Sequence, residues 1–457
     1  MEPGPCRPWV RLAWPGIKGN HLSQDPESAH VLVVGGGPGG STAAALLARR
    51  GLRVTLVEKS RHPRFHIGES LLPMNMPIFE RLGVLEQVMA LGQRKLGADF
   101  PAANESGYSV FRFTRTLNPG TGYAVQIRRD ELDSLLFNHA AACGAQTREQ
   151  TEVLGIDFAS DAATARLRRA DGSVEALRVD YVVDASGRNT LLGTALRLKH
   201  KDPRHQSAAL FAHFDGVARR PGEDSGNISV YRFPSGWVWM IPLPGDCMSV
   251  GVVCYPEYLR QRRGSNADFL LATLQRIPGA RERMQGARMI GHLHATGNYS
   301  YSCSRISGHR WVMVGDAFAF LDPIFSSGVY LAMMSAEKAA EVVAGCLREP
   351  RRETALQRRY ARFIRGGLAQ LSWFIFRFNS PAMARLFAHP RDVLKVEQAM
   401  VSMLAGDVFG TPRVWWRLQL FKLIYLSMWL SLWRRSLRNH RNRRRQINVA
   451  FEGEDLV

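Results

Sequence analysis

The sequence predicts an α/β fold in which a nucleotide-binding domain carries a sheet-rich insertion and is followed by a helical C-terminal region. Three observations lead to this prediction. A buried strand, a glycine-rich turn, a helix and a second strand follow one another between residues 31 and 58. Apolar residues show a period of two over about 207–254, as they do in β-strands. Beyond residue 345 the chain has helical character and becomes strongly basic.

The segment from Val31 to Glu58 contains the parts of a dinucleotide-binding unit. Its glycines follow the G-x-G-x-x-G spacing, which permits a tight turn, close approach to a pyrophosphate and close packing of helix on strand. A helix from Ser41 to about Arg50 would direct its positive N-terminus at the phosphates. Glu58, about 20 residues further on, can hold a ribose hydroxyl. The candidate cofactor contacts here are Gly35, Gly37, Gly39, Gly40, Ser41 and Glu58. This pattern predicts a Rossmann-like domain.

The domain boundaries follow from changes in pattern along the chain. We expect residues 1–29 to be a flexible extension and no signal peptide, because prolines and arginines interrupt any apolar core. The nucleotide-binding domain then covers 30–345, with the sheet-rich insertion at about 196–300. Residues 346–457 form the helical region, which ends in a basic tail rich in Trp and Arg.

Further helices and strands are expected within the nucleotide-binding domain and its insertion. One helix is expected from roughly Pro73 to Leu91, and the strand KLGADF begins at Lys95. The segment YAVQIRRDELDSLLFNHAAACG predicts a strand that enters a helix, and 179–183 predicts a buried strand. Within the insertion, AALFAHF, NISVYRF, GWVWMIPL and CMSVGVVC predict four strands. A strand over 311–315 and a helix from near Ser327 through Ala340 complete the domain.

Composition narrows the classes of partner. The 457 residues carry a formal net charge of +20, from 60 Lys and Arg against 40 Asp and Glu. This surplus favours an acidic partner, such as anionic lipid, nucleic acid or an acidic protein, although a solvated basic surface would have the same composition. The six cysteines form no C-x-x-C pair and no zinc spacing with histidine, so we expect no metal site and a reduced, cytoplasmic setting.

The segment from Val414 to Trp433 is nearly all apolar and contains four tryptophans. A transmembrane helix needs about 20 clean apolar residues, and Arg417 and Lys422 interrupt this one. Seven arginines follow between Arg434 and Arg445. Two interpretations remain open: a helix that lies in a membrane interface beside a polybasic flank, or a helix packed on the protein's own core with a solvated basic end.

Four segments together resemble the flavoprotein monooxygenase superfamily. They are the glycine turn with Glu58, the segment Arg129-x-x-Leu132-Asp133, the segment Asp184-Ala185-Ser186-Gly187, and Gly315-Asp316. The resemblance implies that the glycine turn binds the ADP half of FAD and that Arg129 lies against the cofactor. It also implies that Asp316 holds the ribityl chain and that the following helix points its N-terminus at the flavin ring.

Three further motifs are similar to those of the flavin-dependent halogenases. Trp237-Val238-Trp239-Met240-Ile241-Pro242 is a complete W-x-W-x-I-P. Gly68-Glu69-Ser70 matches the family's G-E-S loop, and Lys95 the lysine downstream of it. Asp322-Pro323-Ile324-Phe325-Ser326-Ser327-Gly328 resembles the halide loop. The resemblance adds Gly68 and Ser70 to the candidate FAD contacts.

The resemblance implies a mechanism. FADH2, delivered by a separate flavin reductase, reacts with O2 to give a flavin hydroperoxide. Chloride or bromide, held by the N–H groups of Ser327 and Gly328, attacks the distal oxygen to give hypohalous acid. That acid travels to the catalytic Lys95, beside which an electron-rich ring is halogenated. Trp237, Trp239, Ile241 and Pro242 form the barrier or tunnel between flavin and substrate.

One difference from the family's halide loop indicates the class of substrate. Family members that act on free tryptophan carry a Glu where Phe325 stands. The resemblance thus implies the branch that acts on phenols, pyrroles or other rings, in secondary-metabolite or pigment biosynthesis. Such rings are often tethered to an acidic acyl carrier protein, which a basic enzyme would attract. We expect no nucleic-acid partner, and we expect the tail to be a candidate contact with the inner membrane surface.

Two other functions would fit the same scaffold. One is an FAD-dependent monooxygenase or prenyl-reductase-like oxidoreductase that uses NAD(P)H. The W-x-W-x-I-P motif and Lys95 argue against this function. The other is a non-catalytic flavoprotein that binds a membrane surface through its tail.

Overall fold

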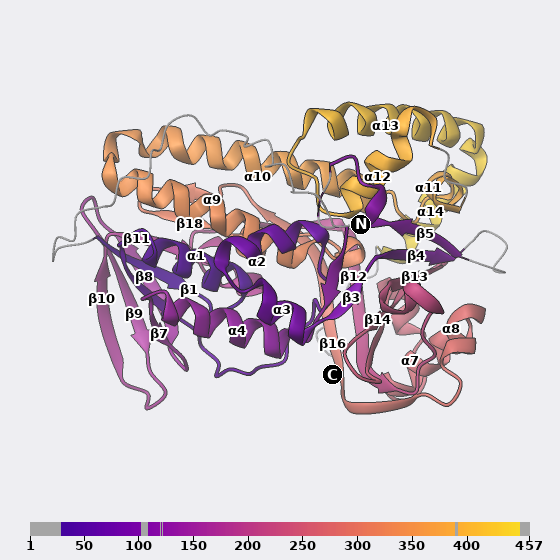
Figure 1. The fold of residues 1–457 in the computed structure, drawn as a ribbon, viewed down its shortest axis with the longest axis horizontal. Coiled ribbons are helices and arrows are strands. Elements are labelled where there is room, and N and C mark those ends of the chain that lie inside the picture. Colours follow the sequence, from indigo (N-terminus) through magenta and orange to yellow (C-terminus); the bar gives the residue numbers. More distant parts are fainter. Residues whose placement is uncertain (1–28, 102–107, 119, 121, 389–391, 448–457) are drawn as a thin grey trace, which may run out of the picture.

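The computed structural model of the protein describes residues 29–447, apart from 102–107, 119, 121 and 389–391. The predicted extension 1–29 therefore lies outside the described residues except for Ala29. Figure 1 shows two sheets side by side, with the C-terminal helices along one edge of the molecule. The predicted α/β fold is confirmed.

A six-stranded sheet forms the nucleotide-binding part, in the order β17-β18-β11-β1-β2-β7. Its strands are β1 (His30–Val34), β2 (Arg53–Val57), β7 (Gln146–Arg148), β11 (Tyr181–Asp184), β17 (Ser307–Gly308) and β18 (Trp311–Met313). All adjacent pairs are parallel except β17 with β18. Helix α1 (Pro38–Ala48) packs against α4 (Arg129–Ala142) and α9 (Gly328–Arg348). Parallel strands end at the same edge, so the loops after β1, β2, β11 and β18 meet there.

Two expected elements differ in their boundaries. Helix α1 begins at Pro38 and not at Ser41, because Gly37 occupies the N-cap and Pro38 the first helical position. The single helix expected over 73–91 is two helices, α2 (Met76–Leu82) and α3 (Leu85–Leu91), which follow the short turn η1 (Pro73–Asn75). Gly83 ends α2 in a left-handed conformation with φ of 76°.

The strand expected to begin at Lys95 is also divided. Lys95 is the last residue of β3 (Gln93–Lys95), which pairs with β6 (Ala124–Gln126). Strand β4 (Gly97–Pro101) starts two residues later and pairs with β5 (Tyr108–Arg112) and with β13 (Ile228–Phe233). The break at Leu96 places the lysine at a junction between two sheets.

The four expected strands belong to an eight-stranded sheet in the order β19-β16-β12-β15-β14-β13-β4-β5. The strands not yet defined are β12 (Lys199–Asp215), β14 (Gly236–Pro242), β15 (Met248–Cys254), β16 (Arg288–Cys303) and β19 (Ala319–Phe320). One face buries an apolar cluster under α6 (Pro256–Arg260), α7 (Asn266–Gln275) and α8 (Pro278–Arg283). The other face, which carries Trp237 and Trp239, packs into the main core.

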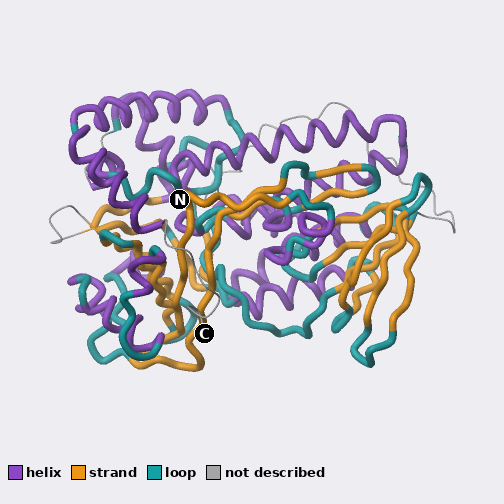
Figure 2. Tube along the Cα trace, turned by 180° about the vertical axis from the view of Figure 1, so that it is seen from behind, coloured by secondary structure: helices purple, strands orange, loops and turns teal. Residues whose placement is uncertain are grey.

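The remaining elements enclose this frame. A small sheet contains β8 (Glu152–Phe158), β9 (Ala163–Arg168) and β10 (Val174–Val179), and α5 (Leu191–Ala195) precedes the long strand β12. The C-terminal helices are α10 (Glu353–Ile375), α11 (Pro381–Ala388), α12 (Val396–Leu404), α13 (Pro412–Ser431) and α14 (Trp433–Ile447). Seen from behind in Figure 2, α10 and α13 again follow one edge. None of the helices in the described part of the chain combines the length and apolarity that crossing a bilayer requires.

The five cysteines among the described residues are free thiols. Cys254, Cys303 and Cys346 are buried, whereas Cys143 and Cys247 are half-buried. Burial raises the pKa of Cys247 and Cys303 to about 11 and that of Cys254 and Cys346 to about 12. These four sulfurs are therefore protonated at neutral pH.

Two adjacent glycines in α10 provide a test of the packing. A Cβ at Gly366 would meet open space, whereas one at Gly367 would lie 2.4 Å from the ring of Phe409. We expect Gly366→Ala to raise the free energy of unfolding by about 0.5–1 kcal/mol through helix propensity. We expect Gly367→Ala to lower it by about 1–3 kcal/mol through overpacking. Urea denaturation of both variants checks this, and equal effects would contradict the packing of α10 on Phe409.

Candidate flavin site and the buried lysine

A cavity of about 700 Å³ lies at the carboxyl edge of the six-stranded sheet. Val34, Val57, Ala185 and Val314, at or just after the ends of four strands, all line it. Its opposite wall comes from the large sheet, through residues such as Phe211. A crevice at this edge is where α/β sheets bind nucleotides.

The glycine turn forms one end of the cavity, and its glycines have different tasks. Gly35 has φ of 103°, and a Cβ there would lie 2.4 Å from the Ala185 carbonyl oxygen. A Cβ at Gly40 would lie 1.8 Å from the Gly35 carbonyl oxygen. Gly37 instead faces open space, since the nearest atom to its Cβ would be 3.7 Å away on Arg64. Gly35, Gly37 and Gly39 line the cavity, so the turn leaves room for a pyrophosphate.

Two predicted cofactor contacts do not line the cavity. Gly40 serves the packing of helix on turn, and the Ser41 hydroxyl donates a hydrogen bond to the Gly36 carbonyl oxygen at 3.2 Å. These two residues therefore shape the turn from behind.

Glu58 directly follows β2, and the sequence predicts that it contacts a ribose. Its Oε2 accepts a hydrogen bond from the Gly36 N–H at 2.8 Å, and its Oε1 accepts one from the Ser60 N–H at 2.9 Å. Burial acts to raise the pKa of Glu58, but Arg64 and these two N–H groups outweigh it and hold the pKa below its usual value. An ionised carboxylate at the cavity wall suits sugar hydroxyls.

Arg64 was not predicted as a site residue, because in the sequence it is only one of several basic residues in the loop 59–70. Its guanidinium contacts Glu58 and Asp133, each at 3.2 Å, and it lines the cavity beside Gly37. A cation next to the open glycine can neutralise a pyrophosphate. The loop's richness in Arg and His was the only signal available.

Arg129 fixes the same loop from the other side. It forms a bidentate pair with Asp133 at 2.8 and 3.0 Å, and its Nη1 donates to the Ile67 carbonyl oxygen at 2.8 Å. Because Asp133 lies one helical turn further along α4, the sequence spacing produces this pair. Arg129, Gly68 and Ser70 all line the cavity.

The large sheet also holds the loop 59–70. The Phe65 ring stacks on His294 with centroids 3.8 Å apart, and Glu69 pairs with His213 at 2.7 Å. Glu69 is buried, and its second oxygen has no hydrogen-bond partner within the described residues. Neither histidine belongs to a recognisable motif, so sequence analysis did not find them.

Asp316 lies in the short turn η5 (Gly315–Ala317) that follows β18, and it lines the cavity. Burial raises the pKa of Asp316 to about 6, against the effect of Arg188 and Arg129. Its backbone carbonyl accepts a hydrogen bond from the Tyr301 hydroxyl at 2.7 Å. A carboxyl group in this position fits hydroxyls of a ribityl chain.

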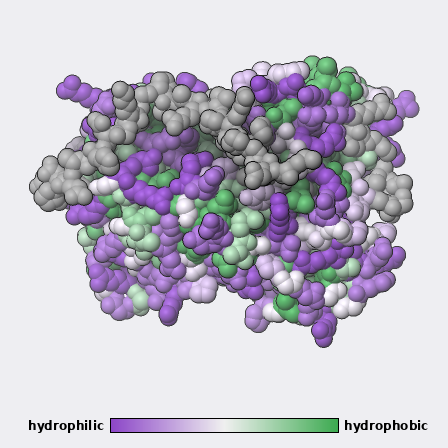
Figure 3. Space-filling model, in the orientation of Figure 1, coloured by the Kyte–Doolittle hydropathy of each residue, from purple (hydrophilic) through white to green (hydrophobic). Residues whose placement is uncertain are grey.

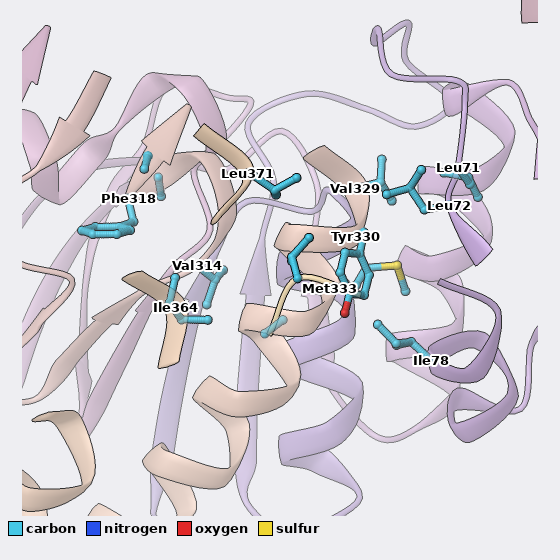
Figure 4. Packing of buried hydrophobic residues seen from close by; sticks show 14 of the residues in the cluster. Leu71, Leu72, Ile78, Val314, Phe318, Val329, Tyr330, Met333, Ile364 and Leu371 are labelled. Atoms are coloured by element: carbon cyan, nitrogen blue, oxygen red, sulfur yellow. The ribbon is translucent and has the colours of Figure 1, made fainter. Parts of the chain in front are cut away.

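The halide-loop candidates lie where α9 begins. Ser326 adopts a left-handed conformation with φ of 55°, Ser327 is the N-cap, and Gly328 is the first helical residue. Gly328 lines the cavity, whereas Ser327 is buried behind it and its side chain makes no capping bond. Figure 4 shows Val329 and Tyr330, in the first turn of α9, close to Leu72 and Ile78. This packing fixes the helix N-terminus at the cavity.

The two indoles form a wall of the cavity together with Ile241, while Pro242 lies outside it. The rings of Trp237 and Trp239 have centroids 5.7 Å apart, and the Trp239 Nε1–H donates to the Ser249 hydroxyl at 3.2 Å. The Trp239 ring fits because Gly251 faces it, where a Cβ would lie 2.3 Å from the ring. Both side chains are buried, so this part of the wall is largely apolar.

The Lys95 side chain is 1% exposed and lies directly behind the loop 59–70. Its Nζ donates to the Ser70 hydroxyl at 2.9 Å and to the Leu71 carbonyl oxygen at 3.1 Å, and it lies 5.4 Å from the centre of the Phe113 ring. Burial lowers the pKa of Lys95 to about 7, although Asp99 acts in the opposite direction. Ser70 lines the cavity and Lys95 does not, so one side chain separates the amine from the cavity.

These residues fit FAD. The open glycine cradle and Arg64 suit the pyrophosphate, the carboxyl groups of Glu58 and Asp316 suit sugar and ribityl hydroxyls, and the N-terminus of α9 suits the flavin ring. The cavity runs continuously past all of them.

Comparisons with known proteins agree with this site. A family model described as an FAD binding domain matches residues 28–362. The flavin-dependent halogenase gsfI of Penicillium aethiopicum is 34% identical over 371 residues, covering 75% of this chain and 69% of that protein. The 1H-pyrrole-2-carbonyl-(peptidyl-carrier protein) chlorinase of Pseudomonas fluorescens is 29% identical, covering 84% of this chain and 90% of that protein.

Among solved structures, the myxobacterial chondrochloren halogenase CndH superimposes with a TM-score of 0.74. It is 29% identical in sequence, and the match covers 88% of this chain and 97% of that structure. The family model, the sequence relatives and the fold thus agree with one another. This chain belongs to the flavin-dependent halogenase family and is an FAD-binding oxidoreductase.

Proposed function

We propose that the protein uses reduced FAD, O2 and chloride or bromide to halogenate an electron-rich aromatic ring. The observation that carries this proposal is the Lys95 amine, which is buried, has a pKa near neutrality and is bonded to a serine of the flavin cavity. An ordinary flavin monooxygenase has no use for such an amine, because its substrate is oxygenated next to the flavin.

The chain's own residues would divide the reaction between two places. Bound FADH2 supplies the two electrons with which O2 is activated for halide oxidation. The backbone N–H groups at Ser327 and Gly328 hold the halide at a positive helix end. The indoles of Trp237 and Trp239 exclude water and keep the aromatic ring away from the cavity. Hypohalous acid then passes toward Lys95.

Lys95 can act in either protonation state near neutral pH. As an ammonium it can donate a proton to the oxygen of hypohalous acid, which makes the halogen more electrophilic. As an amine it can take the halogen and release water. Because the Ser70 hydroxyl accepts from Nζ, its own proton is free to be donated in another direction.

The partners follow from the same proposal. A separate flavin reductase would supply FADH2, and an acidic carrier protein would present a phenolic or pyrrolic ring, as the carrier-bound pyrrole of the Pseudomonas relative suggests. We place the protein in the cytoplasm, in contact with the inner membrane surface through its C-terminal region.

Replacing the lysine tests the proposed function. We expect Lys95→Met to retain FAD binding and oxidation of FADH2 while the yield of brominated monochlorodimedone or phenol falls at least about 100-fold. Lys338→Met, on the surface of α9, is the matched control and should retain activity. Appearance of a hydroxylated product without halogen, in wild type, would instead favour a monooxygenase.

The lysine also predicts a pH dependence of stability. Its pKa is lowered in the folded state from 10.5 to about 7, so between these values the unfolded chain binds the extra proton. The lysine's contribution to stability should therefore rise with pH, by up to about 1.4 kcal/mol per pH unit. Urea denaturation of wild type and Lys95→Met at pH 7.5 and 9.5 measures the difference. A constant difference would show that Lys95 is not buried as an amine.

Flavin affinity should depend on Glu58. We expect Glu58→Gln to weaken FAD binding about tenfold or more, since a hydrogen bond to a charged group contributes about 1.5–3 kcal/mol. Glu175→Gln, in β10 and away from the cavity, is the control. Fluorescence titration gives the dissociation constants, and thermal melts of the apoproteins verify folding. An unchanged affinity would remove Glu58 from the site.

A further inference from the structure

The solvent-facing side of α13 and the start of α14 carries a row of large apolar side chains, here called the apolar stripe. Its members are Trp415, Trp416, Leu423, Leu426, Leu430, Trp433 and Leu437, which are between 36% and 64% exposed. Within α13, the members from Trp416 to Leu430 are three, four or seven residues apart, so they lie on one side of that helix. Trp433 and Leu437 lie one turn apart on α14. Figure 3 shows hydrophobic residues at the edge of the molecule where α13 runs in Figure 1.

The opposite side of α13 is fixed to the protein. Val414, Leu418, Phe421 and Tyr425 are buried. The Phe421 ring lies 5.5 Å from that of Phe374 in α10. The stripe is therefore a second apolar side on a helix that is already packed, and self-packing does not account for it.

The two cations that interrupt the apolar sequence leave the stripe uncharged from Leu423 onward. Arg417 donates to the Leu394 and Arg413 carbonyl oxygens and also lies over the Trp416 ring, 4.1 Å from its centroid, so it borders the first part of the stripe. Lys422 donates to the Gln370 side chain. Both are half-buried. The outward side of α13 from Leu423 to Leu430 thus carries apolar side chains and Ser427, with no charge.

Positive charge borders the stripe. Between Pro412 and Ile447 there are ten Lys and Arg residues and no Asp or Glu, which accounts for half of the net charge of +20. Arg434, Arg435 and Arg438 are exposed next to Trp433 and Leu437. The contacts described for these three arginines include no carboxylate, and Arg434 instead lies over the Trp433 ring at 5.4 Å.

We propose that the apolar stripe and its arginine border dock on the surface of an anionic lipid bilayer. The inference rests on the membrane contact proposed above and assigns it a surface. Tryptophan and leucine on one side of a helix insert at the level of the lipid headgroups, and arginines beside them bind anionic lipid. Within α13 the stripe spans about 21 Å from Trp416 to Leu430 at 1.5 Å per residue.

A bilayer fits these features better than two other occupants. A second copy of the chain would bring two strongly basic surfaces together, which repel each other. An acidic carrier protein would complement the arginines but leave the uncharged part of the stripe in water. A bilayer with anionic headgroups covers both the apolar and the basic parts.

Docking brings α13 and the residues bonded to its start close to the lipid. The Asn118 amide donates to Asp407 and to Thr411, the residue before α13. Through the segment 113–118, α13 is therefore connected to Phe113, whose ring faces the Lys95 amine. An apolar aromatic substrate dissolved in the bilayer would therefore reach the protein on the side of α13.

Vesicle sedimentation with the full chain tests the proposal. We expect vesicles of phosphatidylcholine and phosphatidylglycerol to bind at least tenfold more tightly than phosphatidylcholine alone. The variant Leu423→Ser/Leu426→Ser/Leu430→Ser should lose binding at least tenfold, and Arg434→Gln/Arg435→Gln/Arg438→Gln should lose the preference for phosphatidylglycerol.

Matched variants elsewhere on the surface serve as controls. Leu154→Ser/Val174→Ser/Ile290→Ser removes apolar side chains that are similarly exposed, and Arg276→Gln/Arg281→Gln/Arg288→Gln removes the same charge. Both should bind vesicles as wild type does. Far-ultraviolet circular dichroism, thermal melts and halogenation of a water-soluble phenol show whether each variant is folded and active.

Several results would overturn the proposal. One is that wild type binds neither vesicle, and another is that the leucine variant binds as tightly as wild type. A dimer of wild type in light scattering, with a monomeric leucine variant, would show that a second copy covers the stripe. A carrier protein that binds wild type but not the leucine variant would make the stripe a protein-binding site. Because the soluble-phenol assay is separate, each of these results leaves the proposed chemistry to be judged by itself.

Discussion

The burial of one lysine amine constrains much of this structure. A charged amine is costly to place among apolar groups, so the surroundings must supply acceptors or the amine must lose its proton. Here both occur: Ser70 and Leu71 accept hydrogen bonds, and the pKa falls to about 7. Both acceptors belong to the segment that closes the flavin cavity. The position of the amine and the shape of the cavity are therefore set by the same stretch of backbone.

That stretch is held from several sides. Arg129 binds the Ile67 carbonyl, His213 binds Glu69, and α9 packs its first turn close to Leu72. The contacts come from the nucleotide-binding part, the large sheet and the helix that begins at the halide loop. In the proposed mechanism this stretch separates oxidant production from halogen transfer, which suits a reaction whose intermediate must be kept from bulk water.

The sequence revealed the parts of the site that depend on short stretches of chain. The glycine turn and Glu58 follow from local spacing, and the family resemblance indicated Arg129 and the two indoles; Gly35, Gly37, Glu58, Arg129 and both indoles line the cavity. It could not reveal contacts between distant segments. Arg64 acquires its position from Glu58 and Asp133, and β4 joins the large sheet by pairing with β13, more than 100 residues away.

Apolar periodicity also cannot show where a helix stops or which way a cation turns. The pattern over 73–91 continues through Gly83, yet the left-handed conformation of that glycine ends the helix. Arg417 and Lys422 counted against a transmembrane helix in the sequence. In the fold, Lys422 turns to Gln370 of α10, whereas Arg417 bonds to the Leu394 carbonyl oxygen and lies over the Trp416 ring. Such directions are decided by tertiary packing.

The protonated thiols have a consequence for the durability of such a catalyst. Electrophilic halogen attacks thiolates far faster than thiols, so an enzyme that releases hypohalous acid internally risks damaging its own sulfurs. With pKa values of about 11 to 12, Cys247, Cys254, Cys303 and Cys346 offer almost no thiolate at neutral pH. Oxidant that escaped from the site would therefore react slowly with these four sulfurs.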